Sequence, residues 1–338
     1  MLLGNDRTAV EACLSQGLKV YLCCGAFGTD SEKHPGETLA EDIYGKRQEW
    51  FSSGCPNNAA IRERNLREIS RLCKTEGADG VIIDGARFAS PFSSWDIQAF
   101  FTCFCKDCEQ KAGLLGFHFG RMKQGALALY EFSVGKRESC SEHLGDIASW
   151  LEFRRVCTTE HLRNFSQAVK KESPGLETGA FLFSPSIAWM VGQSYGDLKG
   201  CLDIFVPMIY RAYKQDYGPA CLNHELSRLA ALLSGSGRIQ EKRIIGQLAS
   251  FTGLDLDGFS SAEDILKGLP PEIVGAEVKK AMQTVGGMAK TVPILDFNDD
   301  RLNHSIVSAR QAGAADVALF AYEKERFDKQ KQTLSETI

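Results

Sequence analysis

The stretch Gly80-Val81-Ile82-Ile83-Asp84-Gly85-Ala86-Arg87-Phe88 (GVIIDGARF) decides the fold class of this chain. It follows residues Arg62 to Thr75, in which Leu66, Ile69 and Leu72 fall on one face at helical spacing. A short polar turn separates the predicted helix from the apolar run. An apolar run of this length that ends in polar residues predicts a buried strand whose last side chains emerge at the edge of a sheet.

The same unit of amphipathic helix and apolar strand recurs along the chain. The other expected strands are Leu18 to Phe27, Thr178 to Ser184, Leu202 to Arg211, Arg243 to Phe251, Thr291 to Asp296 and Ala315 to Glu323. Continuous apolar strands bracketed by helices are typical of a parallel sheet that is buried on both faces.

Such a sheet is either open and doubly wound or closed into a barrel. The sequence has no Gly-rich phosphate turn of the G-x-G-x-x-G or P-loop kind. Polar residues instead follow strand after strand, which is the arrangement at the mouth of a (β/α)8 TIM barrel. Seven strands are expected, so the first strand is either lacking or reduced to the stub at Met1 to Gly4. We expect one barrel domain over residues 1–338, in which residues 103–150 form an inserted zinc-loop and helical rim segment.

Composition excludes several classes of protein. The 338 residues carry a net charge of −4, with no Lys/Arg cluster interleaved with aromatic residues, so nucleic acid is not an expected partner. No apolar run approaches the roughly 20 residues of a membrane-spanning helix, and Met1 to Arg7 does not begin like a signal peptide. The twelve cysteines are not spaced like a secreted disulfide framework, which favours a reducing, cytoplasmic location. The oligomeric state stays open.

Three cysteines within six residues, Cys103, Cys105 and Cys108, form the sharpest local signal. A C-x-C-x-x-C run brings three thiolates around one point and suits tetrahedral Zn²⁺, which prefers a fourth ligand. The best candidate for that ligand is Cys55, in a loop expected at the same barrel mouth. The alternatives are plain reduced thiols or an iron–sulfur cluster, and the pair Cys23-Cys24 is a weaker candidate contributor.

This region resembles the zinc-binding loop of the family 42 β-galactosidases. The shared features are a Cys-Pro-Asn context at Cys55, a helix, a strand ending in an acid, and then the C-x-C-x-x-C run. The resemblance implies a structural zinc bound by Cys55, Cys103, Cys105 and Cys108. It covers about a sixth of the chain. That family closes the strand with Asn-Glu, whereas this chain has Asp84-Gly85, so the family's acid/base assignment does not transfer.

A second resemblance concerns two strands. The stretches Gly80 to Phe88 and Leu202 to Tyr210 (LDIFVPMIY) are similar to strands of uncharacterised glycosyl-hydrolase-like barrels. This resemblance implies a glycoside-hydrolase-like barrel and a carbohydrate as substrate or ligand.

Glycoside cleavage needs two carboxyl groups, one as proton donor and one as nucleophile or base. Asp84 is the strongest candidate, because an apolar run delivers it to the mouth. We expect Arg87 to lie within hydrogen-bonding reach of Asp84 and to lower its pKa, which suits a nucleophile; a structural Asp–Arg pair is the alternative. Asp296 and Glu323 each close a later strand and are the candidate partners, with Asp296 favoured.

Other polar and aromatic groups are expected to bind the substrate. These candidates are Trp189, Tyr210, Arg211 and Gln247, with Arg87 beside Asp84. The sequence thus predicts a glycoside hydrolase that uses a carboxylate pair. The alternative is a non-catalytic carbohydrate-binding barrel, because one fold hosts many functions. A zinc hydrolase fits less well, since four Cys ligands leave no open metal position.

Overall fold

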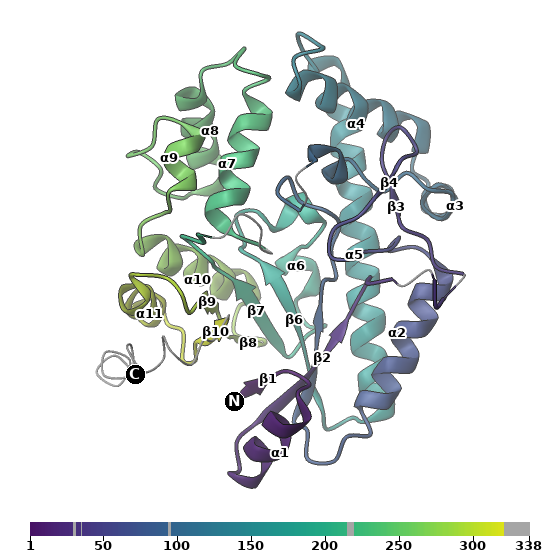
Figure 1. Cartoon of the computed structure of the whole chain (residues 1–338), viewed down its shortest axis with the longest axis vertical. Coiled ribbons are helices and arrows are strands. Elements are labelled where there is room, and N and C mark those ends of the chain that lie inside the picture. Colours follow the sequence, from purple (N-terminus) through teal and green to yellow (C-terminus); the bar gives the residue numbers. More distant parts are fainter. Residues whose placement is uncertain (30–31, 35, 94–95, 215–219, 321–338) are drawn as a thin grey trace.

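A parallel sheet wrapped by helices forms the centre of the molecule (Figure 1). The structure is a computed structural model and describes residues 1–29, 32–34, 36–93, 96–214 and 220–320. The strands of the sheet follow the order β1-β2-β5-β6-β7-β9-β10, and all of their pairings are parallel. The predicted parallel sheet with surrounding helices is therefore confirmed.

The strands of this sheet are short and mostly buried. They are β1 (Leu2–Leu3), β2 (Val20–Gly25), β5 (Gly80–Asp84), β6 (Glu177–Phe183), β7 (Ile204–Met208), β8 (Lys290–Thr291), β9 (Ile294–Asp296) and β10 (Ala318–Phe320). A separate antiparallel pair consists of β3 (Ala40–Glu41) and β4 (Arg47–Gln48).

Helices follow most strands and cover the sheet. The α-helices are α1 (Arg7–Ser15), α2 (Ala59–Leu72), α3 (Lys106–Leu114), α4 (Phe119–Ser133), α5 (Leu144–Glu172), α6 (Tyr195–Leu198), α7 (Leu222–Leu233), α8 (Glu241–Thr252), α9 (Ala262–Leu266), α10 (Glu272–Val285) and α11 (Leu302–Gln311). The 3₁₀ turns are η1 (Ile97–Phe100), η2 (Ser141–His143) and η3 (Ala188–Val191). In Figure 1, α7, α8 and α9 stand on one side of the upper part of the molecule, and α3 and α4 stand on the other.

The sheet curls into a half-barrel whose first strand is short. The stub at the start of the chain provides β1, in which Leu2 pairs with Val20, as the sequence analysis allowed. Strands β8 and β9 both pair with β7 and are separated at Val292 and Pro293. The interruption has a simple cause, because Pro293 has no N–H to donate to a ladder. Within the described residues, no ladder joins β10 to β1.

Close packing inside the sheet explains the glycine that begins β5. A Cβ atom on Gly80 would lie 2.3 Å from the carbonyl oxygen of Glu177 and 2.8 Å from the ring of Tyr21. Any larger residue would push β5 away from β6. Gly80 thus lets the strand that carries Asp84 lie flush against its neighbour.

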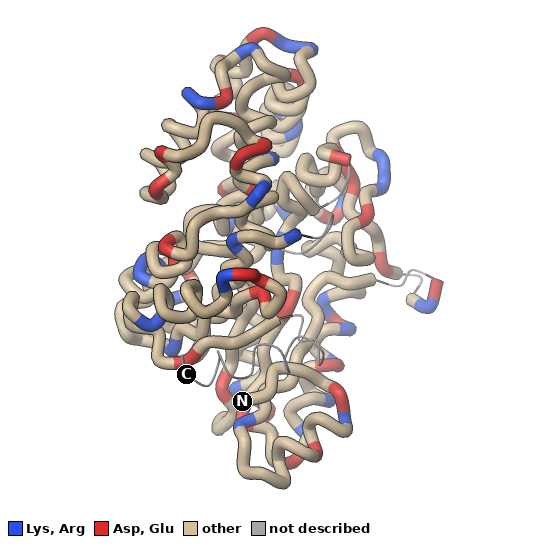
Figure 2. The backbone as a smooth tube through the Cα atoms, turned by 60° about the vertical axis from the view of Figure 1, so that its left-hand side comes forward, with Lys and Arg blue, Asp and Glu red and all other residues tan. Residues whose placement is uncertain are grey.

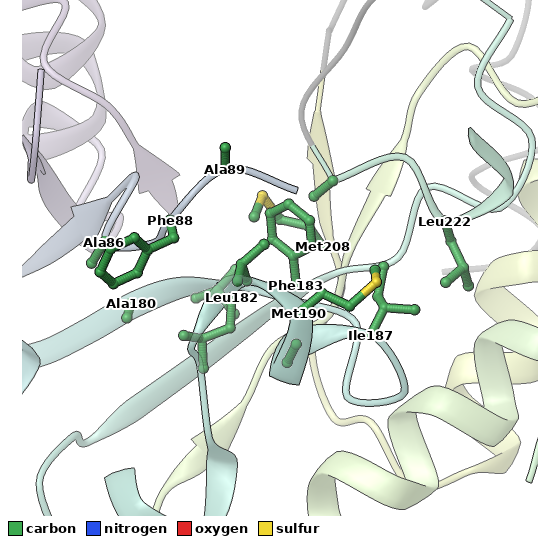
Figure 3. Packing of buried hydrophobic residues seen from close by; sticks show 14 of the residues in the cluster. Ala86, Phe88, Ala89, Ala180, Leu182, Phe183, Ile187, Met190, Met208 and Leu222 are labelled. Atoms are coloured by element: carbon green, nitrogen blue, oxygen red, sulfur yellow. The ribbon is translucent and has the colours of Figure 1, made fainter. Parts of the chain in front are cut away.

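The core lies between the sheet and its covering segments (Figure 3). Phe183 and Met208 are register partners on β6 and β7 and lie next to one another, while Phe88 continues the apolar layer beyond β5. Full burial of one such side chain stabilises the fold by about 1.5–3 kcal/mol. This layer supports the segment that carries the candidate site.

One expected strand is wrong. Residues Arg243 to Phe251 lie in the helix α8, and the buried residues of that helix are Ile244, Ile245, Leu248 and Thr252. These positions recur at helical spacing, a period that the short apolar run concealed. The predicted barrel strand therefore does not exist, and the sheet passes directly from β7 to β8 and β9.

Charged residues of both signs are spread over the whole backbone (Figure 2). Among the described residues, no helix combines the length and the apolar character needed to cross a membrane.

Candidate functional site

Asp84 stands at the carboxyl end of β5, where the apolar residues Val81 to Ile83 deliver it to the mouth of the half-barrel. Asp84 is exposed to solvent, but its carboxyl group lies in a recess with protein atoms on most sides. Burial raises the pKa of Asp84, while the charge of Arg87 and the N–H of Gly85 oppose the shift. The expectation of a lowered pKa is therefore wrong, because the loss of solvation is the larger effect.

A cavity of about 720 Å³ opens beside Asp84. Cys23, Phe181, Met208 and Tyr210 line it, together with residues of β1 and β10. The cavity thus occupies the gap between the two outer strands of the sheet. Its volume lies within the roughly 300–1,000 Å³ of small-molecule sites.

A second cavity of about 240 Å³ lies against the same carboxyl group. Asp84 and Met208 border both cavities, which therefore meet at these two residues. Trp50, Phe51 and Arg87 also line the smaller cavity. The sequence analysis missed both aromatic residues, which precede the candidate ligand Cys55 in an irregular segment.

Arg87 is buried and binds away from Asp84. One of its terminal nitrogens donates to the hydroxyl of Ser93 at 3.1 Å and to the carbonyl oxygen of Phe88 at 3.4 Å. Its guanidinium carbon lies 5.0 Å from the ring centre of Phe183 and 5.8 Å from that of Phe51. The predicted hydrogen bond to Asp84 is wrong, and Arg87 acts on that carboxyl as a nearby charge.

Asp296 ends β9, as predicted, and is 4% exposed. The N–H of Asn298 donates to one of its oxygens at 2.9 Å. Asp84 and Asp296 both raise the pKa of the buried phenol of Tyr210, although burial is the larger cause. Tyr210 therefore lies within electrostatic reach of both carboxyls. The other candidate partner, Glu323, lies outside the described residues.

Glu225 is a buried carboxyl that the sequence analysis missed. It is 1% exposed, and burial raises its pKa to about 7. The N–H of Phe92 donates to it at 3.2 Å, and the hydroxyl of Ser90 donates to its other oxygen. Ser90 also bonds Ser93 at 2.8 Å, so that two serines connect Glu225 to Arg87. This network fixes the segment that follows β5.

A sequence signal for Glu225 did exist. Leu222, Leu226 and Leu229 are buried on α7, and Glu225 falls on the same face of the helix. A carboxyl on an apolar face predicts a buried acid with an internal partner.

Three of the predicted substrate-binding residues lie in other surroundings. Arg211 is buried, forms an ion pair with Asp299 and donates to Ser305 at 3.2 Å. The indole of Trp189 donates to the carbonyl oxygen of Ser186 at 3.1 Å, and its ring packs on α8. Gln247 is exposed on α8, because the predicted strand there is a helix. Tyr210 does line the large cavity, as expected.

The four predicted cysteine ligands come together in one buried cluster. The sulfur of Cys55 lies 3.2 Å from that of Cys105 and 3.6 Å from that of Cys108. With Cys103, all four sulfur atoms lie within 4.8 Å of one another. Thiolates bound to Zn²⁺ at 2.3 Å in a tetrahedron are about 3.8 Å apart, so this spacing fits such an ion. The cluster could hold a metal ion.

Neighbouring groups donate hydrogen bonds to the cluster. The side-chain amide of Asn57 donates to Cys108 at 3.2 Å, its backbone N–H donates to Cys55 at 3.4 Å, and the N–H of Glu41 donates to Cys103 at 3.4 Å. Such bonds stabilise negative charge on sulfur. The mutual hydrogen bonds of the four thiols hold the pKa of Cys105 below its usual range and those of Cys55 and Cys108 above it. The donor set therefore suits thiolate ligands.

Backbone hydrogen bonds connect the cluster to the mouth. The N–H of Cys55 donates to Thr38 at 2.7 Å, and the N–H of Gly54 donates to Phe27 at 2.6 Å. Phe27 follows β2 and lines the smaller cavity. The segment that carries Trp50 and Phe51 is thus held at one end by a candidate metal ligand.

Comparisons with known proteins establish the fold of this chain but not its activity or its substrate. No protein-family profile matches the sequence, and neither does any curated protein. A β-galactosidase from the haloarchaeon Halorubrum lacusprofundi superposes with a TM-score of 0.57 at 14% identity, over 94% of this chain and 46% of its own. The PgaB glycoside hydrolase domain of Bordetella bronchiseptica gives a TM-score of 0.57 at 11% identity, over 98% of this chain and 77% of that one.

A third solved structure has the same architecture. The catalytic domain of the β-amylase from Paenibacillus polymyxa gives a TM-score of 0.53 at 11% identity, over 98% of this chain and 85% of that domain. The chain spans about half the length of the Halorubrum β-galactosidase. This chain therefore has a glycoside-hydrolase-like (β/α) barrel fold, and its chemistry must be argued from its own residues.

Proposed function

We propose that the chain is a glycoside hydrolase in which Asp84 and Asp296 form the carboxyl pair. The observation that carries the proposal is the position of Asp84, an acid with a raised pKa at the meeting point of two cavities in a glycoside-hydrolase-like barrel. A raised pKa keeps a carboxyl protonated closer to neutral pH, as a proton donor requires.

The roles follow from the surroundings of each carboxyl. Asp84 donates its proton to the leaving glycosidic oxygen as the bond from that oxygen to the anomeric carbon breaks. Asp296, which accepts a hydrogen bond from Asn298, supplies the negative charge that stabilises the developing positive charge on the sugar ring. Water then supplies the hydroxyl group for the anomeric carbon and the proton that restores Asp84. This assignment reverses the nucleophilic role that the sequence suggested for Asp84.

The metal-binding cluster has a structural role in this proposal. Zn²⁺ is the ion that four buried thiolates suit best, held by Cys55, Cys103, Cys105 and Cys108. Four protein ligands leave no open position, so the ion would hold the loops together and leave the chemistry to the carboxyls. The twelve cysteines form no disulfide within the described structure, which supports a reducing, cytoplasmic setting.

A second candidate function is a non-catalytic carbohydrate-binding barrel. The observation in its favour is that Asp296 is 4% exposed, whereas Asp84 opens onto the cavities. One accessible carboxyl is enough to bind a sugar hydroxyl, but hydrolysis needs two.

The deciding experiment is a screen of aryl glycosides and oligosaccharides with the wild-type protein, Asp84→Asn and Asp296→Asn. We expect turnover by the wild type and its loss in both variants. Sugar binding without turnover by the wild type would favour the binding protein.

A further inference from the structure

The smaller cavity beside Asp84 has an aromatic wall that the carboxyl chemistry does not use. Trp50 and Phe51 line it together with Asp84 and Arg87. Trp50 is 3% exposed and belongs to the core, whereas Phe51 is 48% exposed. A large apolar side chain at the rim of a cavity is a candidate contact for a ligand.

The backbone presents the Phe51 ring in an uncommon conformation. Phe51 has a φ of 51° and Ser52 has a φ of 49°, in the left-handed region that residues other than glycine seldom adopt. The surrounding chain holds this turn in place. The carbonyl oxygen of Ser52 accepts a hydrogen bond from the N–H of Thr29 at 2.6 Å, and Gly28 and Ser53 form an isolated antiparallel β-bridge.

The electrostatic character of this cavity restricts its ligand. One carboxyl and one guanidinium line it, and their formal charges cancel while Asp84 is ionised, the state that the charge of Arg87 favours. The guanidinium carbon of Arg87 lies 5.8 Å from the Phe51 ring centre. Carboxyl and guanidinium groups both form hydrogen bonds with hydroxyl groups. An uncharged ligand with several hydroxyl groups and one apolar face complements these surroundings.

We propose that Phe51 is the stacking platform of a subsite for an uncharged pyranose, whose apolar face lies on the ring while its hydroxyl groups meet Asp84 and Arg87. This inference rests on the proposed function, because it names the substrate class of the same site. It adds a binding residue from a segment that lies outside the barrel strands.

Calorimetric titration with methyl glycosides tests the subsite directly. Methyl β-D-glucopyranoside and methyl β-D-galactopyranoside are the uncharged probes, and methyl glucosaminide and methyl glucuronide are the charged ones. We expect at least one uncharged probe to bind the wild type more tightly than its charged counterparts. Phe51→Ala should weaken that binding by about 3- to 10-fold, since the aromatic contact is lost.

Two further variants separate stacking from simple packing. Phe51→Tyr should keep the wild-type affinity, because it keeps the ring, whereas Phe51→Leu should bind as weakly as Phe51→Ala. The matched control is Tyr44→Ala, which removes an exposed aromatic ring (54% exposed) from the turn between β3 and β4. This control should bind like the wild type. Equal thermal stability of the variants would show that each one is folded.

Several results would overturn the subsite. They are unchanged affinity in Phe51→Ala, full affinity in Phe51→Leu, preference for a charged glycoside, or no binding of any probe to the wild type. If Phe51→Ala hydrolyses an aryl glycoside with an unchanged KM, the subsite is disproved and the proposed function still holds. If sugar binding depends on Phe51 but no glycoside is hydrolysed, the subsite is supported and the proposed hydrolase activity is disproved.

Discussion

The guanidinium of Arg87 donates to the hydroxyl of Ser93 at 3.1 Å and leaves Asp84 without the hydrogen-bonded partner that the sequence suggested. Ser93 in turn bonds Ser90, which donates to Glu225. Two serines therefore connect Arg87, in the loop after β5, to the buried acid Glu225 on α7, and Arg87 acts on Asp84 only through its charge. The acidity of the candidate catalyst depends on burial first and on Arg87 second.

Replacing Arg87 should change the pH dependence of catalysis. The cation favours ionised Asp84, so Arg87→Met raises the pKa of Asp84 still further. An acid catalyst then stays protonated to a higher pH, and the alkaline limb of the kcat/KM profile should move upward. Arg121→Met, which removes a surface ion pair with Asp146, is the control. An unmoved or lowered limb would contradict the role of Asp84 as proton donor.

Replacing either carboxyl should abolish turnover. Asp84→Asn and Asp296→Asn keep the volume of the side chain and lose the proton or the charge, so we expect losses of about 10³-fold or more in kcat. Thermal denaturation and sugar titration should remain close to the wild type for Asp84→Asn, because this side chain opens onto the cavities. Full activity of Asp296→Asn would show that Asp296 is not the second carboxyl group of the pair.

Removing one cysteine ligand should release the metal. The wild type should contain about one Zn²⁺ per chain by elemental analysis, and Cys105→Ser should contain none. We expect a loss of several kcal/mol in the free energy of unfolding, since metal binding contributes to folding. Cys140→Ser, which alters a half-buried thiol outside the cluster, should keep both metal and stability. A metal-free wild type of normal stability would disprove the site.

The buried acid Glu225 should make stability depend on pH. Its pKa is about 7 in the folded protein, against an ordinary value of 4.5, so the folded state binds more protons between these values. The free energy of unfolding should therefore fall as pH rises from about 4.5 to 7, by up to about 3 kcal/mol. Glu225→Gln imitates the protonated acid and should flatten this part of the curve. A wild-type profile that rises over the same range would show that Glu225 is ionised in the fold.

The sequence predicted features that depend on short-range order. The run before Asp84 reads as a strand because four apolar residues meet a polar end, and the cysteine spacing C-x-C-x-x-C places three thiols together whatever surrounds them. Cys55, the fourth cysteine of the cluster, was predicted because its loop precedes the helix that leads into the same strand. Local pattern was sufficient in each of these cases.

Features that depend on tertiary packing were not predicted. Residues Arg243 to Phe251 read as a strand until the burial of Ile244, Ile245 and Leu248 shows one helical face. Arg211 looked like a sugar ligand because it follows a strand, yet Asp299 from another loop binds it. Phe51 lies in an irregular segment, where the spacing of apolar residues does not indicate which way its side chain points. For Arg211 the deciding partner lies 88 residues away in sequence.

The cysteine cluster also has a topological consequence. Cys55 and Cys108 are 53 residues apart in sequence, and α2 and β5 lie between them. An ion bound by both residues would close a loop around the strand that carries Asp84, and would reduce the conformational freedom of that loop in the unfolded chain. Because the ion would join only the two ends of this loop, α2 and β5 could unfold while it stays bound, and they would refold from a closed loop at a smaller entropic cost.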